Sequence, residues 1–355
     1  MSSPYESLFG TETLTGLIRT FDSEPGNRNC TGIFARNAKK LMPEGTLAKW
    51  DEVVGSRHLA PVVGSEEPAP RQANKAKTTK TSAMAHVRVS KFISGDRLFD
   101  DRAPGKLVPD AEAVIAEELM DLNNLIGNTK EFLCASALLG TITVSSATVP
   151  GSTMTFTVSF SPQTINATNS WASSGTKIIS SELKTIKKTY KDTSGFNAAE
   201  VIIDPDIESY LQGNNEAKGF VANALGANFL LGGTLDGAAL GGLRFGGLSW
   251  QVTDGVYKPE GGLVTRYKTG DKAIFLPSAA QQREVLGWVE GYGKVPAGPV
   301  FTPGGRGAVR QASSRGNYAY AMTSGDPVGI KLIAGWVGLP VLLNPNGVGV
   351  VETTV

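Results

Sequence analysis

Two short patterns in the chain match parts of a serine acyl-transfer site. Ser181-Glu-Leu-Lys184 places a lysine one helical turn after a serine, where a neutral amine can accept the hydroxyl proton. Lys268-Thr269-Gly270 is a second pattern of that enzyme class, but the third, Ser-Asp-Asn, does not occur between them. Lys187, Lys188 and Lys191 follow the first pattern, so it lacks the apolar setting that a neutral lysine requires. A Ser/Lys acyl-transfer enzyme is therefore one hypothesis, and a solvated helix face and a hairpin turn are the simpler interpretation.

The other motifs of enzyme chemistry do not occur in the sequence. There is no GxxxxGK[ST] phosphate-binding loop, no GxGxxG fingerprint at a strand–helix junction and no GxSxG nucleophile elbow. His58 and His86 have no metal-ligand spacing, and Cys30 and Cys134 have neither cysteine nor histidine neighbours. We therefore predict no catalytic, cofactor-binding or metal-binding residues, no cofactor, and a protein that is not an enzyme.

Charged residues form two blocks of opposite sign. The basic block has no acidic residue within it and consists of Arg71, Lys75, Lys77, Lys80, Arg88 and Lys91. The acidic block follows and consists of Asp110, Glu112, Glu117, Glu118 and Asp121. A solvated loop explains the basic block simply, and nucleic-acid binding is disfavoured because no aromatic residue interleaves it before Phe92. A third interpretation is that the basic block of one subunit contacts the acidic block of the next, which would fix register and partner.

Composition indicates a soluble protein with a near-neutral surface. The 355 residues carry a formal net charge of +1, so uniform electrostatic attachment to nucleic acid is not expected. The two isolated cysteines favour a reducing compartment, and the first ten residues do not resemble a secretion signal. The longest apolar run, Leu332 to Leu343, is about half the length of a membrane span. We expect a cytosolic protein without a membrane partner.

A long helix is the element that must position the acidic block. Apolar residues recur at helical spacing from Pro109 to Gly140, and a helix of about 30 residues would be about 45 Å long. Gly127, Asn128 and Thr129 weaken its centre, so we expect a kink or break there. Asp110 is suited to cap its start, and Gly140 to end it.

The basic block belongs to a predicted hairpin. Residues 46–105 contain two strand-like segments around a polar tip, and such a hairpin is marginal by itself in water. Residues 1–45 have little core material, so we expect a disordered tail or an arm that lies on another subunit. Further strands and short helices follow the long helix, which gives an α+β fold. We predict these strands at residues 141–146, 154–160, 199–203, 248–253, 263–268, 273–276, 283–289, 318–323 and 328–343.

The C-terminal segment resembles the end of a known family. Tyr320-Ala-Met-Thr323-Ser-Gly-Asp326-Pro327, followed by Gly338-Leu-Pro-Val-Leu-Leu-Asn344-Pro345, is similar to the ending of the lambda-type major capsid proteins (major capsid protein E family) of tailed bacteriophages. Val201-Ile-Ile-Asp204-Pro205 resembles the apolar strand that ends in Asp-Pro in that family. Asn344 stands where an aspartate is common, and the order of elements matches over nearly the whole chain.

The resemblance implies a Hong Kong 97-type capsid fold with five segments. They are an N-terminal arm (1–45), an extended E-loop (46–105), a peripheral domain (106–195) with a spine helix (109–139), an axial domain (196–317) and a return to the peripheral domain (318–355). The implied function is a major capsid protein that self-assembles into hexamers and pentamers of an icosahedral shell around double-stranded DNA. Implied partners are further copies, scaffold, portal and decoration proteins, and DNA bound without sequence specificity; the implied location is the virion, assembled in the host cytoplasm. A bacterial nanocompartment (encapsulin-like) shell protein is the alternative.

Overall fold

The computed structural model describes most of the chain in thirteen ranges. They are residues 11–21, 29–43, 45, 47–53, 77–94, 111–146, 148–149, 151–218, 244–257, 265–267, 271–297, 310–325 and 328–354. Asp110, His58 and the polar tip of the predicted hairpin therefore lie outside the described residues.

The predicted long helix is confirmed as α5, Ala111–Leu138, an uninterrupted α-helix of 28 residues. Its apolar positions are buried as the spacing predicts: Ile115, Leu119, Leu122, Ile126 and Leu133. The expected break at residues 127–129 is wrong. The Thr129 hydroxyl donates to the Leu125 carbonyl at 3.1 Å, a bond that follows the helical turn. Gly140 ends the segment with a φ of 103°, a conformation that a residue with a Cβ adopts only with strain.

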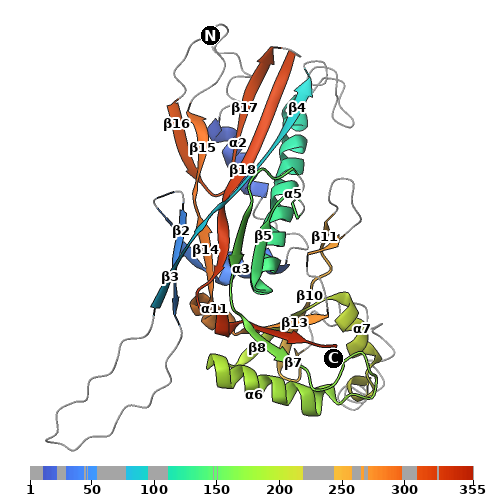
Figure 1. Cartoon of the computed structure of the whole chain (residues 1–355). Coiled ribbons are helices and arrows are strands. Elements are labelled where there is room, and N and C mark those ends of the chain that lie inside the picture. The colour runs from blue at the N-terminus through green and yellow to red at the C-terminus, as the bar shows by residue number, and fades with distance from the viewer. Residues whose placement is uncertain are drawn as a thin grey trace, which may run out of the picture.

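A five-stranded sheet packs on α5 and forms the first unit (Figure 1). Its long central strand is β18, which pairs antiparallel with β17 and β14 along one edge and with β4 along the other. β1 continues the sheet by parallel pairing with β14. The bounds are β1 Lys39–Leu41, β4 Ala85–Ser94, β14 Leu286–Glu290, β17 Tyr318–Gly325 and β18 Val328–Leu342.

A six-stranded sheet with the order β7-β19-β13-β8-β10-β9 forms the second unit (Figure 1). Alternate residues of its central strands face different cores: Ile202 and Ile274 belong to the core of the first unit, whereas Val201 and Phe275 belong to a second core. The bounds are β7 Gln163–Asn166, β8 Ala198–Ile203, β9 Arg244–Phe245, β10 Leu248–Val252, β13 Lys272–Pro277 and β19 Gly349–Glu352.

Helices cover both units, and the described residues also form four two-stranded ribbons. The helices are α2 Thr11–Phe21, α3 Asn29–Asn37, the π-helix η1 Ile178–Glu182, α6 Leu183–Ser194, α7 Pro205–Gly213, α11 Ala279–Val285 and the 3-10 helix η2 Pro345–Gly347. The ribbons are β2 Leu47–Val53 with β3 Lys77–Ala83, β5 Thr141–Val144 with β6 Phe156–Ser159, β11 Val256–Tyr257 with β12 Thr265–Arg266, and β15 Tyr292–Ala297 with β16 Arg310–Arg315. The β2–β3 ribbon is an antiparallel hairpin at one side of the molecule (Figure 1), and Ala48 and Trp50 of β2 are buried in the first core. The alternating segment that was predicted as the second strand of the hairpin is instead β4, which pairs with β18 in the five-stranded sheet.

The described part of residues 1–45 contributes to the first core, which the sequence did not predict. Residues 1–45 were expected to lack core material, but Leu14 and Ile18 of α2 and Ile33 and Phe34 of α3 are fully buried in the first core. Both helices are short. Their stability and burial therefore depend on α5 and on the sheet that they cover, rather than on the helix propensity of their own residues.

Each of the two cores combines segments that are far apart in the sequence. The second core combines Ile165 and Tyr190 with Val351 of β19. Val285 and Val289, expected in the axial segment, belong to the first core. The expected strand at residues 283–289 is helix α11 up to Val285 and strand β14 from Leu286.

Candidate intersubunit surface

The structure brings three of the predicted contact residues together within one chain. β4 runs beside α5, and the Lys91 ammonium forms ion pairs with the carboxylates of Glu118 and Asp121, the latter at 2.9 Å. Glu118 is buried with 1% of its side chain exposed, whereas Asp121 is 59% exposed. The hydrogen bonds to Glu118 and then to Asp121 raise the pKa of Lys91. We expected this contact between two subunits; for these three residues it forms inside one.

The remaining members of the two charged blocks lie in different places. The Lys80 ammonium pairs with the Glu52 carboxylate at 2.9 Å across the β2–β3 ribbon. Arg88 donates a hydrogen bond to the Tyr320 hydroxyl of β17. Lys77 and Glu117 are exposed and Glu112 is in α5, but Arg71, Lys75 and Asp110 are outside the described residues. Lys77 and Glu117 therefore face solvent in the subunit.

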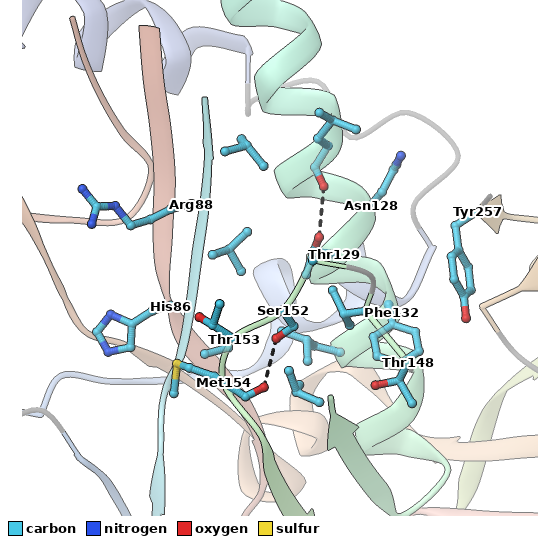
Figure 2. Close-up of a pocket in the computed structure, with 18 of the residues that line it drawn as sticks. His86, Arg88, Asn128, Thr129, Phe132, Thr148, Ser152, Thr153, Met154 and Tyr257 are labelled. Atoms are coloured by element: carbon cyan, nitrogen blue, oxygen red, sulfur yellow. Dashed lines mark hydrogen bonds between the residues drawn. The ribbon is translucent and has the colours of Figure 1, made fainter. Parts of the chain in front are cut away.

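A groove lies between β4, α5 and the loop that joins β5 to β6 (Figure 2). Its volume is about 560 Å³. Apolar and aromatic side chains line most of it, including Val87, Val89, Leu125, Phe132 and Phe156. No acidic side chain lines it among the described residues. It lies beside the helix that carries the acidic block.

Basic side chains lie next to this groove, on the other side of β4. Figure 2 shows His86 and Arg88 pointing away from α5. Partial burial lowers the pKa of His86, and the positive charges of Arg88 and Lys294 lower it further. This part of β4 is therefore an electropositive surface on which His86 stays neutral at pH 7.

The serine acyl-transfer hypothesis finds no suitable geometry in the described residues. Ser181 and Lys184 are both exposed on η1 and α6, whereas Leu183 and Ile186 face inward as predicted. The pair therefore lacks the enclosed, apolar setting that such a site requires. Residues 268–270 are outside the described part of the chain.

Three carboxylates meet in the second unit, which the sequence did not indicate. Asp204, Asp206 and Asp271 have carboxylate oxygens within 4.8 Å of one another. Asp204 caps α7, since its side chain accepts the Ile207 N–H at 2.9 Å, and Asp206 pairs with Arg266 at 2.6 Å. Asp204 and Asp206 therefore each have a structural role, one as a helix cap and the other in an ion pair.

The fold matches solved phage proteins at low sequence identity. A capsid protein assigned to a prophage of Escherichia coli CFT073 aligns with a TM-score of 0.55 and 12% identity, over 90% of this chain and 92% of that one. A phage-related protein from Bordetella bronchiseptica RB50 aligns with a TM-score of 0.52 and 8% identity, over 95% and 96% of the two chains. The architecture is therefore the Hong Kong 97-type phage capsid fold.

The sequence itself identifies the family. The profile described as phage major capsid protein E matches residues 46–288, which is more than half of the chain. The chain belongs to the phage major capsid protein E family, and the predicted resemblance is confirmed. No curated protein sequence matches it. Among the described residues, no helix combines the length and apolar character that crossing a membrane requires.

Proposed function

We propose that this major capsid protein assembles into hexamers and pentamers of an icosahedral shell that encloses phage double-stranded DNA. The observation that carries the proposal is family membership, combined with a β2–β3 ribbon in which β2 is anchored in the first core while β3 has no buried residue. The solvent-facing strand of such a ribbon gains stability when it packs on a neighbouring subunit. Scaffold, portal and decoration proteins are the further partners, and assembly takes place in the host cytoplasm.

We retain the proposed intersubunit contact between the two charged blocks for fewer residues. Lys91, Glu118 and Asp121 are paired inside one chain, and Lys80 has an internal partner in Glu52. The proposed intersubunit contact therefore rests on Arg71, Lys75 and Lys77 on one side and Glu112 and Glu117 on the other. The protein has no catalytic role in this proposal, since the members of its family are structural proteins of the shell.

Electron microscopy of the expressed full-length chain, alone and with a scaffold protein, tests the proposal. We expect closed particles of uniform size, and a folded chain that stays monomeric under both conditions contradicts it. Nuclease treatment of particles from lysed cells separates the two kinds of shell. Protected double-stranded DNA supports the phage capsid, whereas an enzyme cargo without DNA supports the nanocompartment.

A further inference from the structure

Backbone hydrogen bonds and apolar packing fix α3 to the first unit. The Glu131 carboxylate of α5 accepts the Cys30 N–H at 2.9 Å and the Thr31 N–H at 2.7 Å, so it caps the start of α3 from another helix. Glu131 is fully buried. Phe34 packs against Trp288 of β14, with 6.1 Å between ring centroids. The helix is thus held by both a charge-assisted contact and apolar packing.

The two ends of α3 instead reach the second unit. The Asn29 side-chain amide donates to the Val252 carbonyl of β10 at 2.6 Å. At the other end, the Asn37 side-chain amide donates to the Gln282 carbonyl oxygen at 2.7 Å. The fully buried Gln282 amide in turn donates to the Glu200 carboxylate of β8 at 2.9 Å. Both β8 and β10 are strands of the six-stranded sheet.

The six-stranded sheet also packs on the first core through Ile202 and Ile274, and two attachment points on α3 restrain rotation about that packing contact where one point would not. The first and last residues of α3 are about 12 Å apart along the helix axis at 1.5 Å per residue. Figure 1 shows α3 where the two units meet. From these contacts we propose that α3 is a brace that fixes the angle between the two units, with Asn29, Asn37 and Gln282 as positioning residues. The inference rests on the proposed shell function, because the angle between units then sets the curvature of the shell.

The diameter of assembled particles tests the brace. The double variant Asn29→Ala/Asn37→Ala removes both attachments to the second unit and leaves the Glu131 cap in place. We expect it to fold with unchanged circular dichroism but to lose the single particle diameter of the wild type, giving mixed diameters or open sheets. The matched control is Thr15→Ala, which removes a 3.0 Å hydrogen bond from α2 to the Ala319 carbonyl, entirely within the first unit. The control should keep the wild-type diameter.

A second variant covers the case in which the double variant does not fold. Asn37→Asp keeps the shape of the side chain but sets a carboxylate against the Gln282 carbonyl oxygen, which breaks the link to Glu200. Mixed diameters from this variant support the brace. Wild-type diameters from either folded variant overturn it, and so does the same broadening in Thr15→Ala. If the wild type itself forms no shells with a scaffold, the proposed function fails, which is a separate result.

Discussion

The Lys91 ammonium lies 2.9 Å from the Asp121 carboxylate of the same chain and also contacts the buried carboxylate of Glu118. This arrangement ties the edge strand β4 to the long helix α5. Because Glu118 is almost fully buried, its charge needs a partner that remains in place in the folded subunit. The acidic start of α5 therefore has a structural role in the subunit before any neighbour is present.

Replacing Lys91 with alanine should destabilise the subunit. The change leaves the Glu118 carboxylate without its cation, and we expect a loss of about 1–3 kcal/mol in the free energy of unfolding, because a buried charged acceptor loses a bond but the lysine is partly exposed. Since the folded-state pKa of Lys91 is raised, the stabilisation is fully present below its ordinary value and is lost as pH rises through the folded-state value. Urea unfolding near neutral pH measures this loss. The control Lys184→Ala, on an exposed face of α6, should change the free energy of unfolding little.

Removing the Glu131 cap should loosen α3 specifically. Glu131→Gln keeps one acceptor for the Cys30 and Thr31 N–H groups, whereas Glu131→Ala removes both hydrogen bonds. We expect a loss of about 1–3 kcal/mol for the alanine variant and less for the glutamine variant. Amide hydrogen exchange at residues 30 and 31 measures the effect. Unchanged protection there in Glu131→Ala would show that the carboxylate does not hold the helix.

A side chain at Gly140 should strain the end of α5. Its φ is 103°, and an added Cβ would lie 2.8 Å from the Pro162 ring. We expect Gly140→Ala to lower the free energy of unfolding by about 1–3 kcal/mol. Gly175→Ala is the control, since nothing lies within 4 Å of its added Cβ and its φ is not in the left-handed region. Equal thermal midpoints for the two variants would contradict this explanation.

Acid should destabilise the wild type through His86. Its folded-state pKa is lowered, so below the ordinary histidine value the unfolded chain binds a proton that the folded chain resists. Stability should fall as pH decreases from about 7.5 to about 5.5, with the loss beginning near the unfolded-state pKa. The variant His86→Gln should lose less over the same range in urea titrations. An identical pH dependence in both proteins would assign the acid sensitivity to other groups.

Reversing charge near the tip of the β2–β3 ribbon should weaken assembly without unfolding the subunit. In Lys75→Glu/Lys77→Glu we expect fewer shells at physiological salt, with the wild-type circular dichroism spectrum, because like charges would then face the acidic residues of the neighbour. Lys184→Glu/Lys188→Glu makes the same change in net charge on the exposed face of α6 and should assemble normally. Normal shells from the ribbon variant would rule out the proposed contact.

Elements with strong local signals could be predicted from the sequence. The apolar spacing of α5, the β5–β6 pair and the strand ending at Asp204 were all evident from the residues alone. The burial of α2 and α3 was not, because short helices owe their stability to the surfaces they cover. The partner of Lys91 was also assigned to the wrong chain. Residues 95–110, which connect β4 to α5, are outside the described part of the chain. Sequence spacing alone does not show that β4 lies alongside α5.

A cryo-electron microscopy reconstruction of particles formed by the full-length chain is the most direct test of the central claim. The proposal predicts a closed icosahedral shell built from hexamers and pentamers, with the β2–β3 ribbon of each subunit resting on a neighbour. A reconstruction in which the ribbon contacts no neighbour would contradict the proposed role of the ribbon. Particles without fivefold and sixfold capsomers, or a folded monomer that never assembles, would contradict the capsid function itself.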